Sequence, residues 1–344
     1  MVNQRRQRKQ ISGRFLVSHG TTKLFWYMLL FTTSFSITSP MVTAGQKGTP
    51  PLQTKVYSNV AIVIRSQQIA AYNEVIKSFE EECKERNITV KAIYDLKGDP
   101  EESKRIVYAV RNDKQKPHLV LAVGVLAATL AKDQFADIPV IFCMVINHDR
   151  FNLQGANITG ISAEAPLEDQ FAILKEMLGS RKHIGVIYDP RKTGKIISDA
   201  LQAAKKFDIT LLAKEVLSER EVDFALKSMI SDIDAFWIIP DGTVITKEAL
   251  DTIFKRTLKK RIPTFCTSPA IVKAGALVSV SPDYIYTGKQ AANLAQALLN
   301  NPTMLSLGLK QPDKLKITFN TSTAKMIGVS PTFFKTRSDV VFYP

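Results

Sequence analysis

Polar side chains that can hold a small polar molecule follow short apolar runs along this chain. The loops after these runs contain Arg65-Ser66-Gln67, Gly124-Val125, Met144–Asn147, Tyr188-Asp189-Pro190, Pro240–Thr243 and Thr267-Ser268-Pro269. They are rich in hydroxyls, carboxylates and small residues, and several of them open a predicted helix. A helix N-terminus with Ser or Thr donors attracts an anionic group such as a carboxylate. These residue types therefore favour the binding of a small polar molecule.

Residue types that break covalent bonds are also present, but their spacing supports no catalytic site. Cys143 and Cys266 end matching apolar runs, and no histidine is spaced to activate either thiol. Glu164, Glu168 and Asp169 show no spacing typical of a glycosidase pair. The chain contains no GxGxxG, GxxxxGK[ST], GxSxG or HExxH motif. With three scattered cysteines and four histidines, we expect no disulfide scaffold, metal site, cofactor or enzymatic activity.

The apolar runs predict the strands that must position these loops. They are five to seven residues long and do not alternate with polar residues, as in VAIVI at 60–64 and PVIFCMV at 139–145. Such runs are typical of strands buried on both faces of a parallel sheet. Longer amphipathic stretches between them, such as 72–86 and 195–207, predict helices. The pattern repeats after roughly 115–125 residues, which indicates two α/β domains of matching topology.

Three segments, 157–162, 276–283 and 315–320, are predicted to carry the chain between these domains. The fold class is therefore α/β, with two doubly wound parallel-sheet domains joined by a three-segment hinge. We assign residues 57–158 plus 284–314 to the first domain and 159–283 plus 315–344 to the second. Ligands of such sheets bind outside the carboxyl ends of the strands, and a hinge of this kind permits closure about a ligand.

The N-terminal segment carries much of the positive charge. Residues 1–44 contain six Lys and Arg and no acidic residue, so without them the formal net charge falls from +14 to +8. The remaining charges interleave along helices, which indicates solvated faces and no nucleic-acid partner. An apolar run of about 14 residues, 24–37, then precedes Pro40 and Val42-Thr43-Ala44. We predict a signal peptide or an uncleaved N-terminal anchor over 1–44 and a flexible leader over 45–56.

Several stretches resemble one protein family in their amino-acid sequence and in their order along the chain. They are VAIVIRSQQIAAYNEVIKSFEEE, PVIFCMVIN, NITGIS, HIGVIYDP, WIIPDGTVIT, SPAIVKAGALVSVSPDYIYTGKQAANLA and ITFNTSTAKMIGVS. Together they cover roughly residues 57–338. They resemble the ABC-transporter substrate-binding proteins, a family that includes tryptophan- and tyrosine-type amino-acid binders. The resemblance implies the type I periplasmic-binding-protein fold and an amino acid, or a similar small carboxylate, as ligand.

A zwitterionic ligand needs a carboxylate partner for its ammonium group, because a desolvated charge must be paired. Asp241 is our candidate, and its alternative role is to cap the following helix. Asp189, which precedes Pro190, fits helix capping or a turn better. Tyr284 either lines the cleft or packs in the core, and Trp237 is expected in the core. The candidate ligand-binding residues are Arg65, Ser66, Gln67, Tyr72, Gly124, Val125, Met144, Tyr188, Asp189, Asp241, Thr243, Thr267, Ser268 and Asp283.

The resemblance implies an extracytoplasmic solute-binding protein of an ABC importer. Such a protein captures a small molecule between its domains and delivers it to the permease and its ATPase. Contact with the membrane is then expected only through the permease or an uncleaved anchor, and the protein is expected to be a monomer. The alternative is the extracytoplasmic ligand-sensing domain of a membrane signalling system.

Overall fold

The computed structural model describes residues 59–301 and 303–344. The predicted signal or anchor segment and the leader lie outside these residues. The described residues all belong to one compact unit. None of the helices in the described ranges is both long enough and apolar enough to cross a membrane.

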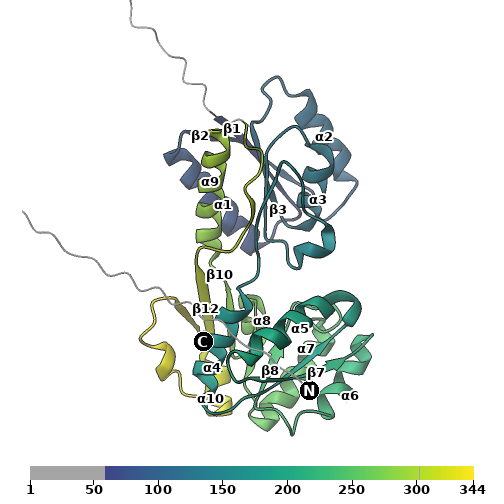
Figure 1. The fold of residues 1–344 in the computed structure, drawn as a ribbon, viewed down its shortest axis with the longest axis vertical. Helices are drawn as coiled ribbons and strands as arrows, with labels where there is room; N and C mark the ends of the chain where they lie inside the picture. The colour runs from purple at the N-terminus through teal and green to yellow at the C-terminus, as the bar shows by residue number, and fades with distance from the viewer. Residues whose placement is uncertain (1–58, 302) are drawn as a thin grey trace, which may run out of the picture. The chain divides into compact units, whose positions relative to one another are not determined.

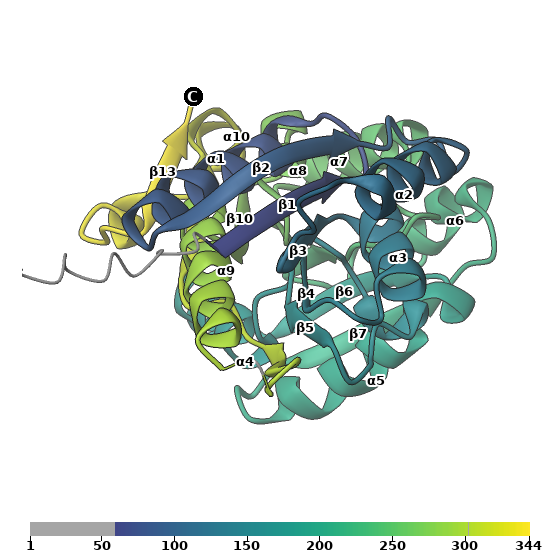
Figure 2. The same ribbon diagram turned by 90° about the horizontal axis from the view of Figure 1, so that it is seen from above.

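The first domain is built on a six-stranded parallel sheet with the strand order β11-β5-β4-β3-β1-β2. Its strands are β1 (Asn59–Arg65), β2 (Ile88–Asp95), β3 (Leu119–Val123), β4 (Val140–Cys143), β5 (Ile158–Ile161) and β11 (Gly308–Lys310). Helices α1 (Ala70–Glu85) and α9 (Tyr284–Leu299) cover one face, and α2 (Glu102–Asn112) and α3 (Val125–Gln134) cover the other (Figure 2). Alternate residues of β1 pack into the two opposite layers, so the strand is apolar throughout.

The second domain is built on a seven-stranded sheet with the order β13-β12-β10-β9-β8-β6-β7 (Figure 1). Its strands are β6 (His183–Tyr188), β7 (Thr210–Glu215), β8 (Ala235–Ile238), β9 (Thr264–Cys266), β10 (Val278–Pro282), β12 (Leu315–Asn320) and β13 (Val340–Tyr343). The helices are α4 (Leu167–Leu178), α5 (Pro190–Lys205), α6 (Val222–Lys227), α7 (Lys247–Lys260), α8 (Pro269–Ala274) and α10 (Thr321–Ile327). Short 3-10 helices are η1 (His148–Phe151), η2 (Glu219–Glu221) and η3 (Thr332–Phe334).

The predicted fold class is confirmed, with one local difference. Both domains are α/β. The first sheet is parallel throughout, and the second is parallel except that β10 and β12 pair antiparallel. The difference arises because β12 enters the second sheet on a return crossing from the first domain. The remaining pairs of the second sheet are parallel.

The chain passes between the two domains three times, by short connections. One follows β5 at residues 162–166, one is Asp283 between β10 and α9, and one is residues 311–314 between β11 and β12. The predicted segments 157–162 and 276–283 each overlap a connection by one residue, and 315–320 begins directly after the third connection. Most of their residues belong to β5, β10 and β12, so each connection itself is shorter than the predicted segment.

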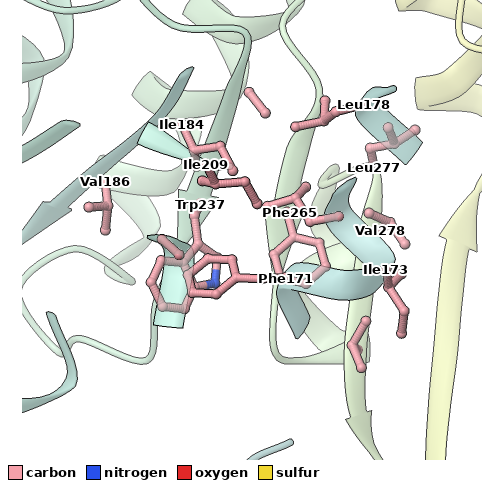
Figure 3. Close-up of a cluster of buried hydrophobic side chains, with 14 of the residues drawn as sticks. Phe171, Ile173, Leu178, Ile184, Val186, Ile209, Trp237, Phe265, Leu277 and Val278 are labelled. Carbon is pink, nitrogen blue, oxygen red and sulfur yellow. The ribbon is translucent and has the colours of Figure 1, made fainter. Parts of the chain in front are cut away.

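The core of the second domain centres on Trp237 of β8 (Figure 3). Its side chain is about 1% exposed, as predicted for a core residue. The ring of Phe171 from α4 meets the indole edge to face, with 5.5 Å between ring centroids. This packing places the indole at the junction of β8 and α4, next to the chain crossing at 162–166.

Helices α1 and α9 lie side by side in the first domain because α9 carries Gly288 at their contact (Figure 1). A Cβ atom at this position would lie 2.4 Å from the Val75 carbonyl oxygen and 2.8 Å from the Phe79 amide nitrogen. Both neighbours are backbone atoms of α1, so they cannot move aside as a flexible side chain would. Only glycine permits this approach of the two helices.

Gly288→Ala is expected to lower the free energy of unfolding by about 1–3 kcal/mol, because the added methyl group forces the helices apart. Urea denaturation monitored by circular dichroism would measure the change. The matched control is Gly194→Ala in α5, where the nearest atom to the new Cβ would be 4.0 Å away. That variant is expected to gain about 0.5–1 kcal/mol from the better helix propensity of alanine. Equal effects of the two variants would contradict the packing argument.

Candidate functional site

The loop after β1, the first turn of α1 and the loop after β3 bring two hydroxyl groups together. We call their residues Ser66, Tyr72 and Gly124 the first rim. Gly124 has φ +89° and precedes the first residue of α3. A Cβ atom there would lie 2.6 Å from both the Ser66 Oγ and the Tyr72 hydroxyl. The Ala127 amide donates to the Ser66 Oγ at 3.0 Å. The glycine therefore lets both hydroxyls approach the N-terminus of α3.

The other candidate residues of the first domain are held differently. The Arg65 guanidinium donates to Asp95 at 2.9 Å and to Asn73 Oδ1 at 3.0 Å, so partners within its own domain already occupy it. Gln67 is exposed, and Val125 and Met144 are half-buried. These three side chains remain accessible at the ends of their strands.

The loops after β6 and β8 form a closed hydrogen-bond network, which we call the second rim: Asp189, Thr193, Asp241 and Thr243. Asp241 Oδ2 accepts from the Asp189 amide at 2.8 Å and from Thr193 Oγ1 at 2.5 Å, and its Oδ1 accepts from the Thr243 amide at 2.8 Å. The side chain is fully buried. It does not cap the following helix, because the N-cap of α7 is Thr246.

Asp189 is the N-cap of α5. Its Oδ1 accepts from the Arg191 amide at 3.0 Å, and the Arg191 guanidinium binds both carboxylate oxygens at 2.9 and 2.7 Å. This guanidinium holds the pKa of Asp189 well below its usual range. Thr243 Oγ1 donates to Asp189 Oδ2 at 3.0 Å and accepts from Lys192 Nζ at 2.7 Å. Donors within the second domain therefore already satisfy both carboxylates of the second rim.

The remaining candidates cap helices, bond to a neighbouring strand or line a pocket. Ser268 caps α8 and Asp283 caps α9 through bonds to the first amides of each helix. The Tyr188 hydroxyl donates to Glu215 Oε1 on the neighbouring strand at 2.9 Å. Tyr284 is half-buried, and burial raises the pKa of its hydroxyl to about 12. Thr267 lines a pocket.

This pocket, which we call the hinge-side pocket, has a volume of about 230 Å³. It is lined by residues 147–149 after β4, by 162 and 164–166 of the first crossing, and by residues of α4, α5, β8 and the loops after β8 and β9. Gln311 of the third crossing also contributes. The lining thus comes from the strand ends of both sheets and from the connections between them.

Three buried polar atoms without a hydrogen-bond partner belong to residues that line the hinge-side pocket. They are His148 Nδ1, Gln170 Oε1 and Trp237 Nε1, and six such side-chain atoms occur in the described residues. Gln170 is 2% exposed, and its Nε2 already donates to the Ala165 carbonyl at 2.7 Å. Buried polar groups in proteins are almost always paired, so a cluster of exceptions marks a place where a ligand or water completes the bonding.

Glu164 adds a carboxylate to the hinge-side pocket. The Asn147 amide donates to its Oε1 at 2.9 Å, while Asn147 Nδ2 donates to the Lys192 carbonyl at 2.9 Å. Burial raises the pKa of Glu164 above its ordinary value of 4.5, and the bond from Asn147 only partly opposes this. Asn147 therefore links the loop after β4 both to the first crossing and to α5.

Sequence reasoning missed Gln170 and Trp237 as pocket residues because neither follows a strand. One signal was present: Gln170 lies three residues after Leu167 and four before Leu174, on the apolar face of α4. A polar residue on the buried face of a helix needs a partner. Trp237 gave no such signal, since an indole in an apolar strand fits a core equally well.

The cysteines are buried and free, and burial raises the pKa of each thiol to about 12. A thiol of that kind is neutral at ordinary pH and is a poor nucleophile. Across residues 59–301 and 303–344, no group of three His, Cys, Asp or Glu side chains is arranged to hold a metal ion.

Comparison with known proteins gives consistent results. The sequence profile described as ABC transporter substrate binding protein matches residues 59–332. A tyrosine-binding protein from Clostridioides difficile is 26% identical over 220 residues, which is 62% of this chain and 63% of that protein. This chain thus spans less than two thirds of that relative's length.

Solved structures share the fold. The ligand-free, open structure of a substrate-binding protein with adhesive properties from Clostridium difficile is 19% identical, with a TM-score of 0.72 over 83% of this chain and 99% of that one. An ABC domain in complex with L-Trp from Streptococcus pneumonia is 18% identical, with a TM-score of 0.61 over 83% of this chain and all of that one.

Glu164→Gln is expected to make the protein more stable at pH 8 and to lose this advantage near pH 4. The raised pKa means that the folded protein binds the Glu164 proton more tightly than the unfolded chain does. The stability from this group is therefore present below pH 4.5 and lost as the pH rises through the raised pKa. Glutamine cannot ionise and avoids the loss.

Thermal unfolding of both proteins across this pH range would measure the difference. Glu168→Gln is the control on the neighbouring turn. Hydrogen bonds from its own backbone amide and from Lys206 lower the pKa of Glu168, so its replacement is expected to cost stability at high pH instead. A difference between Glu164→Gln and the wild type that does not change with pH would contradict the burial argument.

Proposed function

The chain belongs to the ABC transporter substrate-binding protein family, and on that basis we propose that it captures an amino acid for an ABC importer. In this proposal the protein works outside the cytoplasm and delivers its ligand to a membrane permease coupled to an ATPase. The predicted signal or anchor over residues 1–44 supports export, because a positively charged segment precedes a short apolar run there. The protein binds and releases its ligand without changing it.

The hinge-side pocket is the observation that carries this proposal. Its lining comes from loops that follow strands of both sheets and from two of the three connections between the domains. A molecule bound there would contact both domains at once, so binding would favour one relative position of the domains over others. A permease can then distinguish loaded from empty protein by shape.

An amino acid is the ligand class that the family relatives support. The related protein from Clostridioides difficile is described as tyrosine-binding, and the streptococcal structure contains L-Trp. The hinge-side pocket offers hydrogen-bonding groups beside an indole and a large apolar core. We therefore propose an aromatic amino acid, with the unpaired polar atoms of the pocket facing its polar end.

The first rim is proposed to complete the binding site. The Ser66 and Tyr72 hydroxyls lie at the N-terminus of α3, whose first amides have no partner within the helix. Gln67, Val125 and Met144 would border the ligand from the same domain, and Thr267 from the other. The remaining candidates are proposed to shape these loops, because each already makes hydrogen bonds within the protein. They are Arg65, Tyr188, Asp189, Asp241, Thr243, Ser268 and Asp283.

A thermal-shift screen of the purified full chain against the common L-amino acids, small carboxylates and sugars tests this function. A ligand present at about 100 times its dissociation constant adds about 2.7 kcal/mol to the free energy of unfolding. We expect aromatic amino acids to raise the melting temperature and to be recovered unchanged. Sugars as the only stabilising class, or conversion of the ligand, would contradict the proposal.

Gly124→Ala is expected to weaken amino-acid binding about tenfold or more, because the new methyl group displaces the Ser66 and Tyr72 hydroxyls. Isothermal titration calorimetry would measure the affinity. The control is Gly179→Ala, since Gly179 also has a positive φ but no atom lies within 4 Å of its added Cβ. This control has the same type of backbone strain and is expected to bind normally. Unchanged affinity in Gly124→Ala would remove the first rim from the binding site.

A further inference from the structure

We propose that the hinge-side pocket binds the primary ammonium group of the ligand, with Glu164, Gln170 and His148 as the accepting residues. This inference rests on the proposed function, since it assigns one end of the captured amino acid. It also moves the ammonium partner away from Asp241, the residue that the sequence indicated.

The unpaired atoms of the pocket are mostly hydrogen-bond acceptors. Gln170 Oε1 is a carbonyl oxygen and can only accept. His148 Nδ1 has no partner, and it is an acceptor in the neutral ring that carries its proton on Nε2, the nitrogen 3.3 Å from Asp149 Oδ1. Within the described residues, nothing donates to Glu164 Oε2. A primary ammonium group has three N–H donors, which matches three acceptors.

The charges of the residues that line the pocket also favour a cationic ligand group. Its carboxylates are Asp149, Glu164 and Asp199, and Lys195 is its one lysine. Lys195 Nζ is 2.7 Å from Asp199 Oδ2, so that pair is neutral as a unit. No Lys or Arg pairs with Glu164 in the described part of the chain, and its side chain is half-buried. A partly buried carboxylate without a counter-ion is stabilised by an incoming cation.

Trp237 supplies the complementary group. Its Nε1–H is a donor without an acceptor, in a side chain that is about 1% exposed. In an α-amino acid, the carbon that bears the ammonium group also bears a carboxylate, so an acceptor lies beside the three N–H donors. The pocket therefore offers both kinds of group that the zwitterion requires.

Asp241 is poorly suited to the same task. Its two oxygens already accept three hydrogen bonds from the second rim, and its side chain is fully buried. An ammonium group could reach it only by displacing the Thr193 hydroxyl or a backbone amide. Glu164 requires no such exchange.

The indole N–H signal of Trp237 reports directly on the pocket. The chain contains two tryptophans, Trp26 and Trp237, so Trp26→Phe in the full chain leaves one indole signal in a nitrogen-15 NMR spectrum. Three probes separate the groups: L-tyrosine, tyramine, which lacks the carboxylate, and hydroxyphenylpropionate, which lacks the ammonium. We expect L-tyrosine and tyramine to shift the Trp237 signal, because both place an ammonium group in the pocket. Hydroxyphenylpropionate carries the carboxylate that the indole N–H can bind but lacks the ammonium group, so it is expected to shift the signal only at much higher concentration.

Two pairs of variants test the acceptors by calorimetry. Glu164→Gln is expected to weaken L-tyrosine and tyramine about 10- to 150-fold, the value of a hydrogen bond to a charged group, and to leave hydroxyphenylpropionate unchanged. Glu168→Gln, whose carboxylate faces Lys206 outside the pocket, is its control. Gln170→Met removes a second acceptor at similar size, and Gln202→Met on the exposed part of α5 is its control.

The outcomes separate this inference from the proposed function. Tyramine that shifts the Trp237 signal and depends on Glu164 supports the ammonium site, whether or not L-tyrosine binds. L-tyrosine that binds the wild type and both pocket variants equally overturns the ammonium site and keeps the proposed function. No response of Trp237 to tyramine overturns the ammonium site, and no binding of any amino acid overturns the proposed function.

Discussion

A buried polar atom without a hydrogen-bond partner costs a protein about 1–3 kcal/mol, and three of the six such atoms in the described residues belong to the lining of the hinge-side pocket. The carboxylates that follow the strands of the second domain are satisfied locally instead. The second rim shows how thoroughly this is done, since every oxygen of Asp241 and Asp189 accepts from a donor within the same domain. The contrast between the two places is the reason why we propose the pocket as the part of the molecule that a ligand completes.

The surrounding architecture explains why the unpaired polar atoms gather at the hinge-side pocket. Parallel strands end at one edge of their sheet, so the loops of each domain collect at that edge. The three connections between the domains pass through the same region, and one of them carries Glu164 while another carries Gln311. Asn147 then joins the loop after β4 to Glu164 and to α5. In the proposed function, a ligand bound at this point would act on both domains through the residues that connect them.

Much of this architecture was predictable, because it depends on patterns that many residues share. Unbroken apolar runs predicted the parallel strands, and the repeat between the halves predicted two domains. The residues of the pocket depend on individual side chains. Asp241 follows a strand and carries the expected charge, yet its carboxylate already accepts a hydrogen bond from Thr193 of a neighbouring helix. Trp237 packs in the core as predicted, but only the tertiary structure places its unpaired N–H beside a pocket.

The position of the ligand's nitrogen tests this account most directly. A crystal structure of the full chain grown with L-tyrosine would give it, provided that the density distinguishes the amino and carboxyl ends. The account predicts the ammonium nitrogen within hydrogen-bonding distance of Glu164 and Gln170, with the second-rim bonds of Asp241 intact. A nitrogen bound to Asp241, with Thr193 displaced, would contradict it.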